Sequence, residues 1–169
     1  MPRSNQGGNR QSIMNAVVRL EAAFDSMPPR DQVAIVAGYP NSLTPGFKKM
    51  LSNLKKEGFI TYDTSTIRLT NKGRQEVGDV NNRVTTNKAF HDCIREMLAV
   101  PKYRQAFEFL IDGKARSKLE LAAELGYPNA DTPGFKKMLS QIRKHAYVGG
   151  DRDFVQIKDE AFPFGRNQP

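Results

Sequence analysis

One segment of fifteen residues occurs twice in the chain, and this repeat limits the possible folds more than any other feature. Residues 38–52 return as residues 126–140, with thirteen of the fifteen positions identical at an offset of 88. The identities include an asparagine, a threonine, a serine and a Lys-Lys pair. A repeat that served only the fold would keep its apolar pattern while its polar positions drifted. The repeat therefore indicates two similar units with a shared surface task, although a recent duplication would also explain it.

Length and charge agree with this division. A chain of 169 residues can form two units of roughly 80 residues, each large enough for a modest core. The net charge is +8, and segments 44–57 and 132–145 carry +3 and +4 of it. Scattered lysines commonly serve only solubility, whereas positive charge concentrated in two matching segments favours a polyanion. Nucleic acid is the first such partner and an anionic membrane the second.

Several functional classes find no support in the sequence. The single cysteine, Cys93, excludes an internal disulfide, and two histidines with one cysteine cannot form a usual structural zinc site. There is no nucleophile paired with a base, no pair of carboxylates suited to acid–base catalysis and no glycine-rich nucleotide loop. We also expect no membrane-spanning segment and no signal peptide, because the sequence has no long apolar run and its first residues are polar. We therefore expect no enzyme, no cofactor and no metal, and an intracellular location, in the nucleus or in the cytoplasm or nucleoid.

The order of elements is similar in the two units. In the first unit the pattern predicts a helix capped by Ser12, a second short helix, the repeated helix and two strands, at residues 12–26, 31–37, 44–57, 59–62 and 66–69. A small helix or turn should open at residue 70. In the second unit we expect helices from residue 101, over 117–125 and to about residue 144, then strands 146–148 and 154–157 around a turn at 149–152.

These elements predict the domain organisation. A basic disordered arm covers residues 1–11, the first domain 12–77, a linker with a connecting helix 78–100, the second domain 101–160 and an irregular tail 161–169. The connecting helix, residues 87–99, carries an apolar stripe. This stripe should pack against a neighbouring unit, or else form the interface of a homodimer or of a complex with another protein.

The first unit resembles a known family. Its repeated helix continues as Leu51-x-x-Leu54-x-x-x-Gly58-Phe59-Ile60, which is similar to the end of the recognition helix and the start of the wing in MarR-like regulators. Leu69-Thr70-Asn71-Lys72-Gly73 is similar to the motif that commonly follows the wing. The resemblance covers about residues 12–77 and 101–158. It implies two tandem winged helix-turn-helix domains, mainly α with small β-hairpins (α+β), and DNA binding. The second unit departs from the pattern through Ala146 in place of the glycine, a shorter wing and the absence of the later motif.

A helical wheel separates the repeated helix into two sides. Phe47, Met50, Leu51 and Leu54 share an arc of roughly 100°, as do Phe135, Met138, Leu139 and Ile142 in the second copy. The basic residues and one serine lie on the opposite arc. An α-helix fits the major groove of B-DNA, so the sequence predicts a basic helix face for a polyanion.

The start of the helix gives a second argument, because free N–H groups and the helix dipole there favour an anion. Threonine supplies a hydroxyl at this point and glycine allows close approach, although Thr-Pro-Gly is also an ordinary helix start. Lysine suits phosphate better than bases, so Asn41 and Asn129 are weak candidates for base contact. The predicted DNA-binding residues are Asn41, Thr44, Gly46, Lys48, Lys49, Ser52, Lys55, Lys56, Arg68, Asn129, Thr132, Gly134, Lys136, Lys137, Ser140, Arg143, Lys144 and Arg152.

Two functional hypotheses follow. The first is binding of double-stranded DNA, with RNA as a possible substitute, through two copies of one basic helix in transcription regulation, chromatin or replication. The second is a tandem winged-helix scaffold for protein–protein interaction, in which the helix face need not be basic. The concentration of charge favours the first hypothesis.

Overall fold

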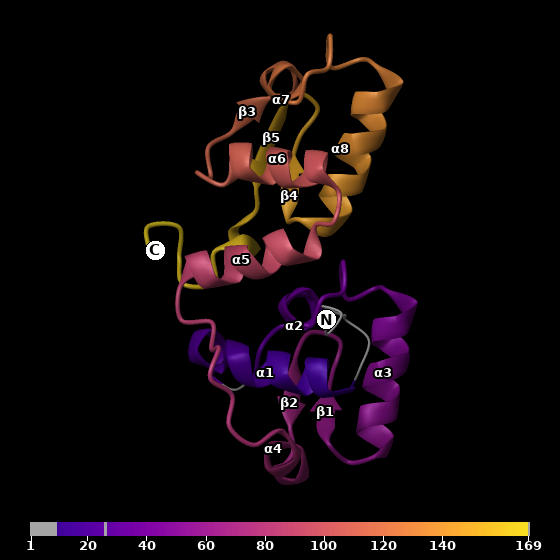
Figure 1. The fold of residues 1–169 in the computed structure, drawn as a ribbon, viewed down its shortest axis with the longest axis vertical. Coiled ribbons are helices and arrows are strands. Elements are labelled where there is room, and N and C mark those ends of the chain that lie inside the picture. The colour runs from indigo at the N-terminus through magenta and orange to yellow at the C-terminus, as the bar shows by residue number, and fades with distance from the viewer. Residues whose placement is uncertain (1–9, 26, 169) are drawn as a thin grey trace, which may run out of the picture.

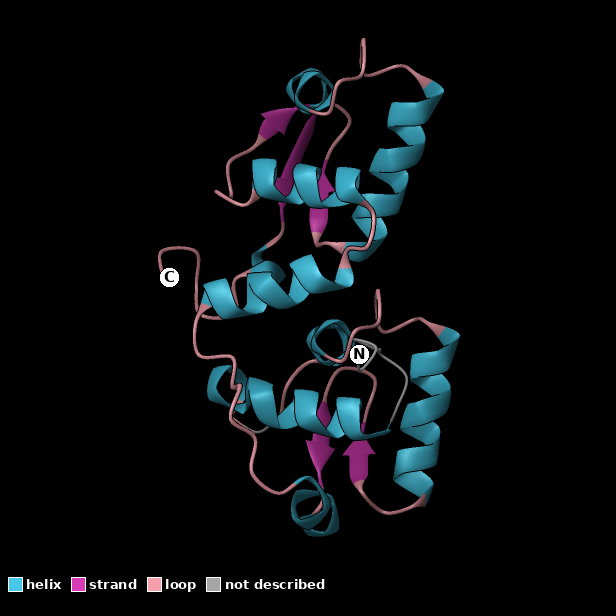
Figure 2. Cartoon of the chain, in the orientation of Figure 1, coloured by secondary structure: helices cyan, strands magenta, loops and turns pink. Residues whose placement is uncertain are grey.

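The computed structural model describes residues 10–25 and 27–168, which form an α+β protein of α-helices and two small antiparallel sheets (Figure 2). Residues 1–9 of the expected arm, including Arg3, lie outside the described residues. Arg10 and Gln11, which were expected in that arm, belong to the first helix. Ser12 therefore lies inside this helix and does not cap it.

The first half of the chain, residues 10–77 without residue 26, follows the expected order. Its elements are α1 (Arg10–Phe24), α2 (Arg30–Val36), α3 (Pro45–Lys56), β1 (Ile60–Tyr62), β2 (Ile67–Leu69) and α4 (Asn71–Val77). Thr70 caps α4 by accepting a hydrogen bond from the N–H of Gly73 at 3.1 Å. Residues 78–86 contain no helix or strand, as the linker prediction requires.

The second half, residues 101–161, adds two elements that the sequence pattern did not predict. Its elements are α6 (Pro101–Leu110), β3 (Arg116–Ser117), α7 (Lys118–Glu124), α8 (Pro133–His145), β4 (Val148–Gly150), β5 (Phe154–Ile157) and the 3-10 helix η1 (Asp159–Ala161). Between the halves lies α5 (Asn87–Met97). The unpredicted elements are β3 and η1, both too short to leave a periodic pattern in the sequence.

Figure 1 shows the second half above the first in nearly the same orientation. The repeated helices α3 and α8 lie along the same long edge of the molecule and run in the same direction (Figure 1). The helix α5 lies between the halves and packs against α2. Its apolar stripe is covered within the chain, since Phe90, Ile94 and Leu98 are buried. A second copy or another protein would therefore have to bind this helix through its polar side.

The two sheets show that the structural repeat extends beyond the fifteen-residue segment. In the second half the strand order is β3-β5-β4, with Ser117 paired to Phe154. The first half has β1 paired to β2 and a single bridge between Pro29 and Thr66. This bridge lies at the same offset of 88 from the Ser117–Phe154 pair. The third strand of the first half is thus reduced to one residue because proline cannot donate a ladder hydrogen bond.

The hairpin turns of the two halves are the same, so the expected shorter wing in the second unit is wrong. Asp63 Oδ1 accepts hydrogen bonds from the N–H groups of Ser65 and Thr66, each at 2.7 Å. Asp151 Oδ1 accepts equivalent bonds from Asp153 and Phe154 at 2.8 and 2.9 Å. The aspartate that closes the turn is the same in both halves, and the three residues after it all differ.

The second hairpin begins two residues later than expected. In the first half Gly58 leaves α3 with a φ of 81°, whereas in the second half Tyr147 takes the left-handed conformation with a φ of 54°. The chain therefore reaches extended geometry only at Val148, and Gly149 and Gly150 belong to β4 and not to the turn. The replacement of the helix-ending glycine by Ala146 moves the left-handed residue one place along, to Tyr147, since alanine avoids positive φ. The strand itself begins at the equivalent position in both halves, because Val148 corresponds to Ile60 at the offset of 88.

The aspartates of the two turns predict an acid-sensitive contribution to stability. The N–H groups of Thr66 and Ser65 lower the pKa of Asp63, and those of Phe154 and Asp153 lower the pKa of Asp151. A folded-state pKa below the usual 3.8 adds stability that is full above this value and is lost as the pH falls through the folded-state pKa. Asp151→Asn keeps the acceptor oxygen but cannot titrate there. Its unfolding free energy should therefore fall less than that of the parent between roughly pH 5 and roughly pH 2, measured by urea unfolding. Equal losses in both proteins would contradict this assignment.

Candidate nucleic-acid interface

The apolar sides of the repeated helices face the cores as predicted. Phe47, Leu51 and Leu54 of α3 are fully buried, and Met50 packs against the same core with partial exposure. Phe135, Met138, Leu139 and Ile142 of α8 are all buried. Burial of such side chains contributes about 1.5 to 3 kcal/mol each, which fixes the rotation of each helix about its axis. The opposite side of each helix must then face solvent.

The exposed side of the two helices forms what we call the lysine edge, made of Lys48, Lys49, Lys55, Lys56, Lys136, Lys137 and Lys144. All seven side chains are exposed. Among the described residues only Lys136 has a carboxylate within ion-pair distance, that of Asp131 at 3.6 Å. Lys55 lies over the ring of Tyr62, with its Nζ 5.1 Å from the ring centre. Ser140 is exposed beside these lysines and Ser52 is half-buried. The lysine edge therefore carries positive charge that the described residues barely neutralise.

Several residues of the repeat have a structural reason to be identical. Tyr39 contacts Phe47 edge-on with ring centres 5.2 Å apart, and Tyr127 contacts Phe135 in the same way at 5.6 Å. Tyr39 is buried in its core, and Tyr127 is half-buried. The tyrosine rings also lie against the helix starts. A Cβ at Gly46 would be 3.7 Å from the Tyr39 ring, and one at Gly134 would be 3.3 Å from the Tyr127 ring.

The asparagines and threonines of the repeat also make local hydrogen bonds. Asn41 Oδ1 accepts from the N–H of Leu43 at 2.9 Å, and Asn129 Oδ1 from that of Asp131 at 2.8 Å. Thr132 caps α8 by accepting from Phe135 at 3.3 Å, while Thr44 instead donates to the carbonyl of Asn41 at 2.9 Å. These bonds explain the repeated turn without any ligand. The identical residues that the fold does not use are chiefly the lysine pairs.

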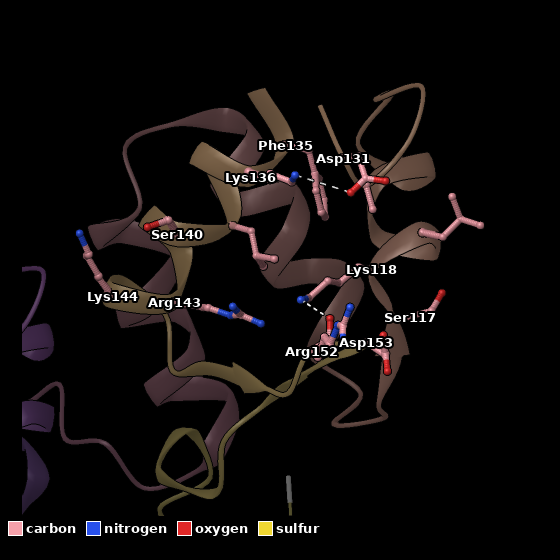
Figure 3. Close-up of a pocket in the computed structure, with 13 residues that line it drawn as sticks. Ser117, Lys118, Asp131, Phe135, Lys136, Ser140, Arg143, Lys144, Arg152 and Asp153 are labelled. Carbon is pink, nitrogen blue, oxygen red and sulfur yellow. Dashed lines mark hydrogen bonds and ion pairs between the residues drawn. The ribbon is translucent and has the colours of Figure 1, made fainter. Parts of the chain in front are cut away.

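A groove adjoins the lysine edge in the second half (Figure 3). It has a volume of about 840 Å³ and lies between α7, α8 and the turn of the β4–β5 hairpin. Figure 3 shows Arg143 pointing from α8 towards the turn that carries Arg152, and Arg143 donates to the Asp151 carbonyl at 3.3 Å. The lining includes two acidic residues and five basic ones, namely Lys118, Lys136, Arg143, Lys144 and Arg152. Its net charge is positive.

Sequence reasoning missed Lys118, which opens α7 and donates to the carbonyl of Arg152. In the first half Arg30 opens α2 at the same offset and donates to the Asp63 carbonyl at 3.0 Å. A comparison of the two halves at an offset of 88 beyond the identical segment would have found this pair. Sequence reasoning also missed Leu119, whose side chain lines the groove and is 62% exposed.

Two other expectations concern Arg68 and Arg10. Arg68 lies within β2, on the exposed side of the strand, and its Nη2 is 2.7 Å from the sulfur of Met27. It therefore does not belong to the turn of the hairpin. Arg10, expected in the arm, forms an ion pair with Glu57 and lies over the ring of Phe59. This ion pair neutralises Glu57, the only acidic residue of segment 44–57, so Glu57 does not offset the positive charge of the lysine edge.

His91 and Cys93 of α5 have partners inside the protein. His91 Nε2 is 2.8 Å from the carbonyl oxygen of Ala161, and burial lowers the pKa of its imidazole. Burial raises the pKa of the Cys93 thiol, which accepts a hydrogen bond from Arg19 at 3.3 Å. Within the described ranges, no group of three or more His, Cys, Asp or Glu side chains is arranged to hold a metal ion. No helix in the described part of the chain has the length and apolar character needed to cross a membrane.

Comparisons with protein-family models, with curated proteins and with solved structures give no match to this chain.

Substitution of the two glycines at the helix starts tests why they are identical in both halves. Glycine is there either because a tyrosine ring packs against it or because a phosphate approaches closely. Gly46→Ala should stabilise the fold by up to about 1 kcal/mol, because alanine favours the helix and the new methyl group meets Tyr39 at ordinary distance. Gly134→Ala should gain less, since the Tyr127 ring must move. Urea unfolding measures both changes. If the glycines serve only packing, neither variant should change duplex DNA affinity. A loss of about tenfold or more in both would instead indicate close approach of a phosphate.

Proposed function

We propose that the protein binds double-stranded DNA along the lysine edge, through two tandem winged helix-turn-helix units, in transcription regulation, chromatin or replication. The observation that carries the proposal is the repeated lysine pair on α3 and α8. Lys48 and Lys49, and their counterparts Lys136 and Lys137, are exposed. The helices that carry them, α3 and α8, lie along one long edge of the molecule (Figure 1). The lysine pair is identical in both halves although no packing requires it.

The energetics of phosphate binding favour this surface. Lysines without protein partners keep their counterions until a polyanion replaces them, and the release of those counterions drives binding. A lysine that is already paired would instead have to break an ion pair first. The exposed side chains of the lysine edge meet the first condition, because of its seven lysines only Lys136 has the carboxylate of a described residue within 4.0 Å.

The order of the elements supports the winged-helix part of the proposal. Each half has three helices followed by a two-stranded hairpin, and a third strand segment pairs with the hairpin before the second helix. Such an order leaves the third helix exposed beside the hairpin, as a helix that enters the major groove must be. In the second half the groove between α8 and the hairpin turn carries Arg143 and Arg152. Both side chains can reach phosphate from there.

A protein scaffold is the weaker alternative. Interfaces between proteins are depleted in lysine at their centres and enriched in aromatic residues. The lysine edge has the reverse composition. Of the rings nearby, that of Tyr62 is covered by Lys55, and those of Tyr39 and Tyr127 pack against phenylalanines of the cores. The exposed Leu43 and Leu119 are single residues, of a kind that is common on protein surfaces.

The salt dependence of duplex binding tests the proposal. The logarithm of the association constant should fall with the logarithm of salt concentration by about 0.9 per phosphate contacted. The double variants Lys48→Ala/Lys49→Ala and Lys136→Ala/Lys137→Ala should each reduce this slope by about 2. Fluorescence anisotropy with a random duplex measures the slope. Duplex RNA should bind more weakly, because its deep major groove does not admit a helix.

The control is Lys88→Ala/Lys114→Ala, which removes the same number of lysines. Lys88 is paired with Asp92 at 2.9 Å, whereas Lys114 has no carboxylate within 4.0 Å among the described residues. Both lysines are exposed, and the segments that carry them lie on the other long edge of the molecule (Figure 1). The control should leave the slope unchanged, and circular dichroism should show all three variants folded. If the two edge variants and the control behave alike, the lysine edge is not the binding surface.

A further inference from the structure

A small crevice lies where the end of α8 meets α2 and the turn before α3. We call it the junction crevice. Its volume is about 140 Å³, and the side chains that matter here are Asp31, Arg143, Lys144, His145, Tyr147 and Lys158. The halves touch beside it, because Asn41 Nδ2 donates to the Lys144 carbonyl at 3.4 Å. A water molecule occupies about 30 Å³ of liquid and typical ligand pockets hold 300 to 1,000 Å³. The crevice therefore suits a small ion and not a nucleoside.

Two polar atoms of the junction crevice are buried without a hydrogen-bond partner among the described residues. They are Nδ1 of His145 and the hydroxyl oxygen of Tyr147. Burial raises the pKa of Tyr147 well above its usual value, with the Asp31 and Glu160 carboxylates adding to the effect, so the hydroxyl keeps its proton. Buried polar groups in folded proteins almost always have partners. A hydroxyl that lacks an acceptor, beside an imidazole nitrogen that lacks a partner, indicates a ligand with acceptor oxygens.

The charges around the junction crevice have the sign that such a ligand requires. Arg143, Lys144 and Lys158 line it, against the Asp31 carboxylate in the lining and the Glu160 carboxylate, which acts on Tyr147 from outside the lining. Asp31 already accepts hydrogen bonds from the backbone and the hydroxyl of Ser42. Within the described residues, neither Lys144 nor Lys158 has a carboxylate within 4.0 Å. Their ammonium groups remain available for an anion.

The backbone at Tyr147 differs from its counterpart at this site. Tyr147 has a φ of 54°, which is unfavourable for a residue with a side chain, whereas in the first half Gly58 takes the left-handed conformation and Phe59 follows it. The ring of Tyr147 lies near that of Phe90, with the centres 6.1 Å apart, at the contact between the halves. The ring of Phe59 lies instead under Arg10 and Lys72. The two halves thus differ in backbone conformation and in ring placement at the position where the crevice forms.

We propose that the junction crevice binds one phosphate group, which accepts hydrogen bonds from His145 and Tyr147 and is neutralised by Lys144 and Lys158. Phosphate offers several acceptor oxygens in one small group, and its hydrogen bonds to charged donors are stronger than those between neutral groups. The crevice lies between the two repeated helices. The phosphate group can come from two sources. One is a backbone phosphate of the DNA, and this assignment rests on the function proposed above. The other is free inorganic phosphate.

Histidine NMR on the full chain tests the site directly, with inorganic phosphate added at constant ionic strength set by chloride. The imidazole signals of His145 should shift saturably, and bound phosphate should raise the pKa of His145, which burial and the Lys144 charge otherwise lower. His91 is the internal control, because it is buried against the Ala161 carbonyl and should not move. Equal shifts with chloride, or equal shifts of both histidines, would overturn the proposal.

Tyr147→Phe removes only the hydroxyl. Because this group has no partner in the free protein, the variant should unfold at no lower urea concentration than the parent. Its phosphate affinity should nevertheless fall by about tenfold or more, as expected for a lost hydrogen bond to a charged group. Unchanged phosphate affinity in a folded variant would show that the hydroxyl does not contact the ligand, which overturns the proposal.

Duplex titrations with the same variant identify the source of the phosphate. If the group belongs to the DNA backbone, Tyr147→Phe should weaken duplex binding by a similar factor and inorganic phosphate should compete with the duplex. If it is free phosphate, only the NMR affinity should fall, and the site stands with that ligand. Phosphate binding without any duplex binding would sink the proposed function and leave the crevice site intact. If the protein binds the duplex but neither assay shows phosphate binding, the proposed function stands and the crevice site is overturned.

Discussion

Burial of Phe47, Leu51 and Leu54, and of their counterparts in α8, determines which side of each repeated helix faces solvent. The edge contacts of Tyr39 with Phe47 and of Tyr127 with Phe135 hold the start of each helix against the preceding turn. With rotation and start both fixed, the lysines have only one direction in which to point. The charge of the exposed edge is therefore a consequence of apolar packing, and weakening that packing would scatter the charge.

The sequence predicted the helices well because their signals are local. Caps, apolar periodicity and terminal glycines lie within a few residues of each element, so α3, α5 and α8 begin within one residue of expectation. The same helical period correctly predicted which side of α3 and of α8 is buried and which is exposed. Strand β3 could not be predicted, because two residues become a strand only through pairing with β5 far along the chain. The groove beside α8 depends on that pairing, since it positions Lys118 against the hairpin turn.

The comparison of the halves also shows what a repeat can hide. The hairpin turns share only an aspartate, yet Asp63 and Asp151 make the same pair of backbone hydrogen bonds. Judged by residue identity the second hairpin looked truncated, whereas its geometry is complete. Conversely, the identical glycines at the helix starts suggested a ligand and turn out to lie beneath tyrosine rings. Identity between copies reports function only after the contacts of each residue have been accounted for.

The parallel placement of the halves has a consequence for any long ligand. Two units related by a two-fold axis present mirror-ordered surfaces, so a linear polymer looks the same to them from either end. Here both helices begin at the same end of the molecule (Figure 1), so the chain has a distinguishable head and tail. A polymer lying along this edge would meet one chemical pattern twice in the same order. Successive molecules could then follow one another along it, each facing the same way.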